Sequence, residues 1–440
     1  MNQRIIYLSF VAAVSGLLFG FDTAVISGAD KPIQQLWGLS DLFHGIFIMS
    51  SALWGTVLGA MFGGLPLDKY GRKKSLIGIG ILYLVSAIGS GLAWGPISFA
   101  IFRFIGGLGV GASSVAAPTY ISEIAPNKHR GRLVALYQFL IVLGILVAFF
   151  SNWLVDKTFD ANVAWRWMVG LEAIPAALYL IFIVGIPESP RWLAVYKKDF
   201  AKAKLIFKQL DPTGDEEALV ADLKENDADK AGENIFAKKY ARPLLLAFLV
   251  SFFNQASGIN FIIYYAPRVF EETGMDASGS LMASIGIGVA NLIFTMAGVA
   301  LIDKLGRRTL MIIGSFGYII SLFLVSYAFY SNSFAGVQWF VFLFIAAHAI
   351  GQGAVIWVYI SEIFPNQSRG QGQSFGTAVH WVGASIITLI MPYVLNKFQG
   401  GPIFLFFGVM MILQLIWAVF YMYETKNKSL EQIEKELLHE

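Results

Sequence analysis

The chain alternates between long apolar segments and short polar connections. Twelve apolar segments are long enough to cross a bilayer, which takes about 20 residues for about 30 Å of hydrocarbon. They lie at 5–28, 43–67, 75–94, 97–121, 132–155, 164–186, 242–266, 279–303, 309–330, 334–360, 371–395 and 401–423. Helices satisfy their own backbone hydrogen bonds in lipid, and no segment alternates as a barrel strand would. The pattern therefore predicts an all-α membrane protein with twelve spans.

The composition agrees with a chain that faces lipid. Of the 440 residues, 56% are hydrophobic and only 14% are charged, whereas a soluble protein carries roughly a quarter charged residues. The chain has no cysteine, which excludes disulfides, thiol catalysis and lipid anchors on cysteine. The first apolar segment is of span length and contains Asp22, so we expect a permanent helix there and not a cleaved signal.

Lysine and arginine positions predict the orientation, because cytoplasmic loops are enriched in them. With the N-terminus inside, cytoplasmic segments hold 26 of the 32 basic residues, and Arg103 lies within a span. The other five fall in the expected external loops: Lys31, Lys157, Arg166, Arg268 and Lys397. We expect a multi-pass protein of the plasma (inner) membrane with both termini cytoplasmic. The basic residues mark topology, so no nucleic-acid partner is expected.

Two motifs occur twice, which indicates an internal repeat. The segment from Asp68 reads Asp-Lys-Tyr-Gly-Arg, and the one from Asp303 reads Asp-Lys-Leu-Gly-Arg, 235 positions later. Ser122-Glu-Ile-Ala-Pro-Asn returns as Ser361-Glu-Ile-Phe-Pro-Asn, 239 positions later. Two halves of equal topology follow, as in transporters with parallel repeats.

These repeats divide the chain into four parts. We expect a six-helix half at 1–186, a cytoplasmic linker at 187–241, a second six-helix half at 242–423 and a cytoplasmic C-terminal helix at 424–440. The linker's helically spaced apolar residues favour short amphipathic helices, while its Asp, Glu and Lys content leaves a disordered linker as the alternative.

Several further motifs carry a family resemblance over essentially the whole chain. They are Gly20-Phe-Asp22-Thr-Ala-Val-Ile-Ser-Gly28, the two Asp-Lys-x-Gly-Arg loops, Pro187-Glu-Ser-Pro-Arg191-Trp-Leu and Asn254-Gln255-Ala-Ser-Gly-Ile-Asn260. In this order and at these spans, they resemble the sugar porter family of the major facilitator superfamily. The resemblance implies the major facilitator fold and monosaccharide transport. One departure touches the substrate: the usual Gln-Gln pair of the seventh span is Asn254-Gln255 here.

Two ionisable residues lie inside spans, where a charge costs about 2.5–3.5 kcal/mol. In the predicted orientation, Asp22 and Arg103 both fall in the outer half of the membrane at similar depth, so each is the other's expected partner. One interpretation is a static pair that fixes helix packing. The other is proton coupling, since an aspartate stays ionised beside an arginine and takes up a proton once separated and desolvated. The resemblance favours coupling, because facilitators of this family carry a neutral residue at the position of Asp22.

Charged residues at the cytoplasmic ends recur at equivalent places in both halves. They are Asp68, Arg72, Glu123, Arg130, Asp303, Arg307, Glu362 and Arg369. Positive-inside topology accounts for the arginines but not for the glutamates. The resemblance implies that Glu123 and Glu362 each bridge to arginines of their own half. This network would hold the outward-open state and break as the carrier opens inward.

A free sugar offers hydroxyls and apolar C–H faces, so its site needs neutral amides, imidazoles and aromatic rings at mid-membrane. The spans supply Gln138, Asn254, Gln255, Asn260, Tyr265, Asn291, His348, Trp357, His380 and Trp381, with Phe19 one turn before Asp22. Hydrogen bonds between helices could explain one or two such amides but not a cluster. Gln138, Gln255, Asn260, Asn291 and Trp357 match sugar-contacting positions of the family one for one.

Two histidines refine the expected sugar. His348 stands where glucose and xylose carriers usually have phenylalanine, and His380 stands where they have asparagine or glutamine. Both segments resemble those of the mammalian fructose facilitator, although that carrier lacks the tryptophan at Trp357. A ketohexose, fructose, is therefore favoured.

The predicted function is a proton-coupled monosaccharide symporter that works by alternating access. The alternatives are an uncoupled facilitator, a glucose- or xylose-proton symporter and, last, a non-transporting sugar sensor. No metal-ligand spacing, phosphate loop or nucleophile–base pair is visible, so neither an enzyme nor a cofactor is expected. The expected partners are a small-molecule sugar, protons and lipid, and the expected state is a monomer.

Overall fold

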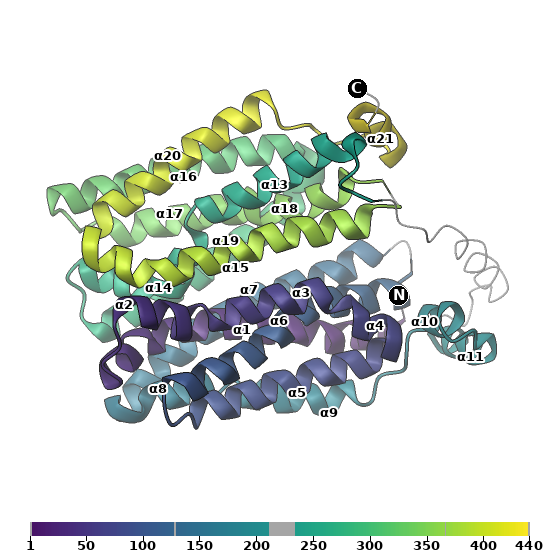
Figure 1. The fold of residues 1–440 in the computed structure, drawn as a ribbon, viewed down its shortest axis with the longest axis horizontal. Coiled ribbons are helices and arrows are strands. Elements are labelled where there is room, and N and C mark those ends of the chain that lie inside the picture. Colours follow the sequence, from purple (N-terminus) through teal and green to yellow (C-terminus); the bar gives the residue numbers. More distant parts are fainter. Residues whose placement is uncertain (1, 127–128, 211–233, 366, 439–440) are drawn as a thin grey trace.

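The computed structural model describes residues 2–126, 129–210, 234–365 and 367–438, and these residues form helices and short connections without a β-strand. Two helical bundles lie side by side, one coloured purple to blue and one green to yellow (Figure 1). Twelve helical segments are long and apolar enough to cross a membrane. The twelve spans expected from the hydrophobic pattern are thus confirmed, and the arrangement is the major facilitator fold.

The first bundle is built from the N-terminal part of the chain. Its elements are α1 (Gln3–Leu36), α2 (Asp41–Phe43), the π-helix η1 (His44–Met49), α3 (Ser51–Phe62), α4 (Gly64–Tyr70), α5 (Arg72–Gly91), α6 (Pro96–Ile124), α7 (Arg130–Thr158), α8 (Ala161–Gly170) and α9 (Ala173–Ile183). Glycines allow close helix contacts here: a Cβ on Gly20 of α1 would lie 1.9 Å from the Ile141 carbonyl oxygen of α7.

The second bundle follows a short helical bridge. The bridge holds α10 (Pro190–Val195) and α11 (Phe200–Leu210), and the rest of it, at 211–233, lies outside the described residues. The bundle itself contains η2 (Lys238–Tyr240), α13 (Ala241–Ala256), α14 (Ile259–Glu272), α15 (Ala277–Leu305), α16 (Arg307–Ser331), α17 (Val337–Ile350), α18 (Gln352–Glu362), α19 (Arg369–Phe398) and α20 (Gly400–Phe420), and α21 (Leu430–Leu438) closes the chain.

Several helices extend beyond the expected spans. The first span was expected to end at 28, but α1 continues to Leu36, so Lys31 lies on a helix and not in a loop. Arg268 lies on α14 for the same reason, and Lys157, Arg166 and Lys397 lie on α7, α8 and α19. Lys31 pairs with Glu271 and Arg268 pairs with Asp30, so these two charges are balanced where α1 and α14 continue beyond the apolar run.

Two spans of the second bundle are broken near mid-membrane. Ser257 and Gly258 separate α13 from α14, and Gly258 has φ +85°, a left-handed conformation that favours glycine. Gly351 separates α17 from α18, with φ −85° and ψ −98°. Broken helices at this depth free backbone and side-chain polar groups, and in transporters they occur where a cavity receives them.

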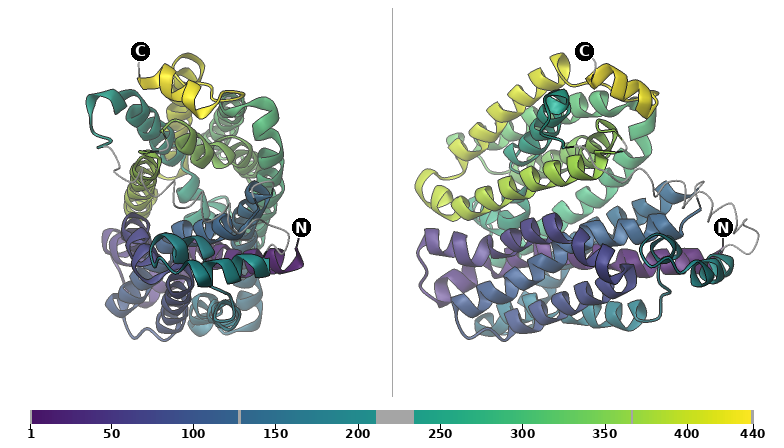
Figure 2. Two further views of the ribbon diagram at one scale, coloured as in Figure 1. Left: turned by 90° about the vertical axis from the view of Figure 1, so that its right-hand side faces the viewer. Right: turned by 45° about the vertical axis from the view of Figure 1, so that its right-hand side comes forward.

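In the described part of the chain, the bundles meet where α7 packs on α15, where α2, η1 and α3 pack on α19, and where α1 packs on α14. Both chain termini lie at one end of the molecule, here called the terminal end (Figure 1). Figure 2 shows, in its left view, both bundles from the terminal end. Contact is tightest at the opposite end, where a Cβ on Gly45 of η1 would lie 1.9 Å from the Leu389 carbonyl oxygen of α19.

Candidate functional site

An ion pair lies buried in the first bundle. Arg103 of α6 contacts the Asp22 carboxylate of α1 through Nη1, and its Nη2 donates to the Asp22 carbonyl oxygen at 3.0 Å. Both residues are only 2% exposed. The structure therefore places the two intramembrane charges that the sequence paired by depth in direct contact.

A third charged residue, absent from the sequence prediction, completes this group. Glu172, between α8 and α9, is 1% exposed, and it interacts electrostatically with Asp22 and Arg103. Neither of its carboxylate oxygens has a hydrogen-bond partner in the described part of the chain. One arginine thus serves two buried carboxylates. The signal in the sequence was a lone glutamate inside the sixth apolar segment.

Aromatic rings and amides form a second group where α1 meets the second bundle. The Phe19 ring lies 5.7 Å from the Trp381 ring, and the His380 ring lies 4.8 Å from Trp381 and 5.0 Å from Trp357. Gln255 contacts the His380 ring with its Nε2 at 3.2 Å. We call this set, together with Asn260, the aromatic–amide cluster.

The cluster keeps binding capacity for a ligand. Trp357 is 37% exposed, and the Trp381 indole Nε1 has no acceptor among the described residues. Asn260 Nδ2 donates to Gln255 Oε1 at 2.8 Å, which leaves the Asn260 oxygen as an acceptor. One half-exposed ring face and unused polar atoms are what a hydroxyl-rich ring molecule needs.

Most of the other sequence-predicted residues have hydrogen-bond partners of their own. The Tyr265 hydroxyl donates to the Thr388 carbonyl oxygen at 2.7 Å, and Asn291 accepts from Thr295 within α15 at 3.3 Å. His348 of α17 bonds through Nδ1 to the Tyr318 hydroxyl of α16. Asn254 donates to Gln352, a residue that the sequence analysis did not single out. Gln138 is half-buried on α7.

At the terminal end, each bundle carries a matching arginine clamp. Arg72 donates to Glu123 at 2.8 and 2.9 Å, and Arg307 donates to Glu362 at 2.6 and 3.0 Å. Each arginine also pairs with an aspartate one turn earlier, Asp68 at 3.5 Å and Asp303 at 3.2 Å. The clamps join helix ends within one bundle and do not cross between bundles: α5 to α6 in the first and α16 to α18 in the second.

The remaining two arginines of the expected network behave differently. Arg130 donates through Nε to the Ser122 carbonyl oxygen at 3.1 Å. Arg369 has no hydrogen-bond partner for Nε and Nη2 within the described ranges. Its charge interacts with the Glu362 carboxylate of the same bundle.

The opposite end is closed by charged residues from both bundles. Asp30 of α1 accepts from Arg268 of α14 at 2.8 Å and contacts His44 Nε2 at 2.6 Å, and Lys31 pairs with Glu271. Five hydrogen bonds between described residues join the bundles at this end. Deeper in the molecule, Tyr264 of α14 interacts with Thr23 and Asp22 of α1. Asp30 and His44 were not among the predicted site residues, because the first span was expected to end before them.

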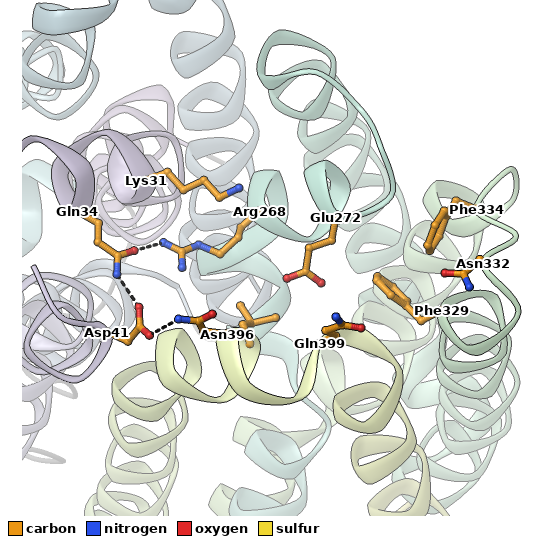
Figure 3. Close-up of a pocket in the computed structure, with 11 residues that line it drawn as sticks. Lys31, Gln34, Asp41, Arg268, Glu272, Phe329, Asn332, Phe334, Asn396 and Gln399 are labelled. Atoms are coloured by element: carbon orange, nitrogen blue, oxygen red, sulfur yellow. Dashed lines mark hydrogen bonds between the residues drawn. The ribbon is translucent and has the colours of Figure 1, made fainter. Parts of the chain in front are cut away.

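A polar cavity of about 630 Å³ lies against this closure. Figure 3 shows Gln34 bridging Arg268 and Asp41, and Asp41 reaching Asn396 of α19. The residues that line the cavity include Lys31 and Arg268 of the closure and none of the aromatic–amide cluster. We therefore assign it to the closed entrance and not to the ligand site.

Buried charges within one bundle, a polar cluster between two bundles and closure at one end define a membrane carrier of the major facilitator type. The family model described as "Sugar (and other) transporter" matches residues 8–437, and the chain belongs to this family.

Relatives extend over nearly the whole chain. A putative metabolite transport protein of Bacillus subtilis, YwtG, is 37% identical over 99% of this chain and 96% of its own length. The arabinose-proton symporter of the same organism is 35% identical over 98% of this chain and 94% of its own length. Among solved structures, the inward-open xylose transporter XylE of Escherichia coli superposes with a TM-score of 0.88 at 31% identity, covering 98% of this chain and 100% of XylE.

Proposed function

We propose that this protein is a monosaccharide-proton symporter that works by alternating access. The observation that carries the proposal is the Asp22–Arg103 pair, with Glu172 beside it, one helical turn from the Phe19–Trp381 contact. A buried ion pair offsets the desolvation of its charges only while the two groups stay in contact. A change in helix packing that separates them therefore leaves a carboxylate that is more stable with a proton. The arabinose-proton symporter among its relatives agrees with such coupling.

Glu172 suits the same role. It is buried beside Asp22, and the two carboxyl groups share Arg103 as their counter-charge. With one arginine for two carboxylates, a proton can reside on Glu172 while Asp22 stays ionised, and it can pass to Asp22 when Arg103 moves away. The three residues then form a proton-holding group, and not a static packing contact.

The arrangement supports an inward-open state. Charge asymmetry predicts that the terminal end is cytoplasmic, and the end bridged by Asp30, Arg268, Lys31 and Glu271 is then the external one. At the terminal end, no bond between described residues joins the bundles. The arginine clamps are formed here within their own bundles, so an inward-open state does not agree with the expectation that they break as the carrier opens inward. The high TM-score to an inward-open XylE structure supports the inward-open assignment.

We further propose a hexose substrate, with fructose favoured. His380 contacts Gln255 and lies between Trp357 and Trp381, so it occupies the centre of the aromatic–amide cluster. Because the Gln255 amide nitrogen donates to one ring nitrogen, the other ring nitrogen is left as a donor to a sugar hydroxyl. His348 supports the pocket differently, because it bonds to Tyr318. Competing candidates are a pentose and glucose, since the named relatives include an arabinose-proton symporter and the solved neighbour is a xylose transporter.

Proteoliposomes with an imposed pH gradient test the proposal. Labelled fructose, glucose, xylose and arabinose are offered separately, and proton uptake is followed with a pH dye. Asp22→Asn is expected to abolish sugar-driven proton uptake and gradient-driven accumulation while sugar exchange persists. Asp276→Asn, an exposed aspartate at the start of α15, is the matched control and should keep both activities.

Each result separates one alternative from the others. Normal proton uptake by Asp22→Asn would contradict the coupling. Uptake by the unmodified protein that ignores the pH gradient would identify a facilitator, and competition by glucose or xylose without fructose would contradict the fructose assignment. Binding without transport would identify a sensor.

A further inference from the structure

A continuous chain of buried side-chain hydrogen bonds crosses the second bundle. Gln414 of α20 donates to Ser315 Oγ of α16 at 2.8 Å, and Gln352 of α18 donates to Gln414. Asn254 of α13 donates to Gln352 at 3.2 Å, and Gln255 donates to Asn254 at 3.1 Å. The chain ends at Asn260 and His380 of the aromatic–amide cluster. We call these bonds, from Ser315 to Asn260, the amide chain.

All its members are buried. Ser315, Gln352 and Gln414 are 0% exposed, and Asn254 and Gln255 are 2% exposed. Neutral amides buried in a membrane bundle are costly unless their hydrogen bonds are made. Helix packing alone does not need five of them in one line, so the chain calls for a functional explanation.

The amide chain has a direction. Every amide in it donates with its nitrogen toward Ser315 and accepts on its oxygen from the cluster side. Ser315 sets this direction, because its own hydroxyl donates to the Met311 carbonyl oxygen at 2.7 Å and its oxygen can then only accept. Gln414 must therefore face Ser315 with nitrogen, and each following amide is oriented by the one before it.

The chain also links the two helix breaks of the bundle. Gln352 is the first residue of α18, directly after Gly351, and Asn254 and Gln255 lie in the last turn of α13, directly before Ser257 and Gly258. Both breaks free helix ends near the cluster. A hydrogen bond between Gln352 and Asn254 fixes one broken helix relative to the other.

We infer that Ser315, Gln414 and Gln352 are positioning residues for sugar recognition: they fix which atom of each cluster amide faces the sugar. With the observed direction, Asn260 presents its oxygen, an acceptor, to a sugar hydroxyl, because its nitrogen donates to Gln255. If every hydrogen bond in the amide chain ran in the opposite direction, Asn260 would present its nitrogen, a donor. A sugar hydroxyl that donates to Asn260 would then lose its acceptor. This inference rests on the proposed sugar transport and adds residues that do not themselves touch the sugar.

Two serines on one helix provide a matched test. Ser315 and Ser326 both lie on α16, are 0% and 3% exposed, and both bond to α20, since Ser326 donates to the Gly401 carbonyl oxygen at 2.8 Å. Only Ser315 belongs to the amide chain. Ser315→Ala is expected to raise KM for the transported sugar about tenfold with kcat little changed. The reason is that the amide chain loses its fixed direction, which weakens the hydrogen bond between Asn260 and the bound sugar. Ser326→Ala should leave KM within about twofold of the unmodified protein.

Sugar analogues test the direction itself. Mono-O-methyl ethers of fructose, glucose and xylose keep an acceptor oxygen at the methylated position but cannot donate from it. The unmodified protein should discriminate most strongly against the ether whose parent hydroxyl donates to Asn260. Ser315→Ala and Gln352→Met should narrow this discrimination about tenfold, and Ser315→Thr, which retains a hydroxyl, should restore it. Equal discrimination in all variants would overturn the inference.

A stability measurement judges the amide chain without any substrate. Ser315→Ala and Asn254→Leu are combined in a double-mutant cycle, and thermal unfolding of the purified proteins is measured. Residues that share no direct contact usually act additively, so non-additive effects indicate coupling through Gln414 and Gln352. The same cycle with Ser326→Ala should be additive. Additive effects in both cycles would overturn the inference, whereas absence of sugar uptake by the unmodified protein would contradict only the proposed function.

Discussion

Asp22, Arg103 and Glu172 place one positive charge among two carboxyl groups inside the membrane. Arg103 is the only member whose removal leaves both carboxylates without a counter-charge. A buried charge that loses its partner costs about 3–5 kcal/mol, far more than the net contribution of an intact pair. The arginine should therefore determine the stability of the first bundle more than either acid does.

Arg103→Leu is expected to lower the melting temperature markedly, with a cost of about 3–5 kcal/mol. Adding Asp22→Asn should recover part of the loss, since it removes one of the two uncompensated charges. Differential scanning fluorimetry of the purified proteins measures both effects. If Arg103→Leu melts at the temperature of the unmodified protein, the buried pair does not stabilise the fold.

At this scale the sequence predicted one contact well and missed others. Asp22 and Arg103 could be paired because two opposite charges at equal depth in lipid must find each other. Glu172 was missed, since its sequence neighbours are apolar and its position along the sixth span does not by itself identify a partner residue. Gln352 was missed because it lies beside Gly351, where a broken helix gives no signal in the hydrophobic pattern.

Two glycines of the second bundle, Gly258 and Gly274, have left-handed backbone conformations but different surroundings. Gly258 separates α13 from α14 with φ +85°, and a Cβ there would lie 2.7 Å from the Phe407 ring of α20. Gly274 has a similar φ of +90°, but a Cβ there would meet no atom within 4 Å. The two glycines thus share the cost of a left-handed conformation and differ only in packing.

Gly258→Ala is expected to destabilise the protein by about 1–2 kcal/mol from φ alone, with a further cost from Phe407. Gly274→Ala should show only the first cost. The difference in melting temperature between the two variants measures the packing part, and sugar uptake should fall only in Gly258→Ala. Equal melting temperatures would mean that Phe407 moves aside without cost.

The C-terminal helix α21 is held by ionic contacts outside the membrane. Glu436 accepts from Lys428 and from the Tyr423 hydroxyl, each at 2.7 Å. These bonds hold the pKa of Glu436 below its ordinary value of 4.5. Because the folded pKa is depressed, the contact stabilises α21 fully above that value and is lost as the pH falls below it.

Acidification below about pH 4 should therefore release α21 from Tyr423 and Lys428. Since the chain has no cysteine, a spin label on Gln432→Cys reports the mobility of this helix against pH. Glu436→Gln should be mobile at every pH, and Glu434→Gln, on the same helix, is the control. A mobility that does not change with pH in the unmodified helix would contradict the ionic contact.

Element positions were the part most accessible to sequence reasoning. Each of the twelve spans exists, because a bilayer-length apolar run has few other folds available. The breaks at Gly258 and Gly351 and the π-helix η1 were not foreseen, since hydropathy averages over them. Helix ends were misjudged by up to eight residues in α1, which continues to Leu36 where a first span ending at 28 was expected.

At the scale of the whole molecule, contacts at the closed end determine the equilibrium between conformations that are closed and conformations that are open at this end. Gly45 of η1 lies against Leu389 of α19, and Arg268 of α14 holds Asp30 of α1. A larger side chain at Gly45, or loss of Arg268, removes closure without touching the aromatic–amide cluster. Either change should shift the population toward the state that is open at this end.

Gly45→Leu and Arg268→Ala should expose a cysteine placed under the closure at Thr388, which is 0% exposed. Its labelling by a membrane-impermeant maleimide should quicken about fivefold for each ~1 kcal/mol of shift. Thr388→Cys alone is the reference, and Asn396→Ala, which removes only the contact with Asp41, should have a smaller effect. Unchanged labelling in all variants would show that the end is closed by other contacts.

The two bundles were predictable from the repeated motifs, since a duplicated sequence implies duplicated topology. Their relative placement was not, because it depends on contacts such as Gly45 with Leu389 and Asp30 with Arg268, which lie far apart in the chain. Orientation across the membrane stays a prediction from the basic residues.

The charged group and the cluster belong to different bundles. Asp22, Arg103 and Glu172 all come from the first, whereas Gln255, Asn260, Trp357, His380 and the amide chain come from the second. Phe19 contacts Trp381 between the two groups, and Tyr264 of α14 in the second bundle interacts with Asp22 and Arg103. We expect substitutions in the second half of the chain to change mainly which sugar is transported, while the Asp22–Arg103–Glu172 group in the first half retains the proton coupling. A hybrid carrier that joins the first half of this protein to the second half of another family member should transport the other member's sugar and remain coupled to protons.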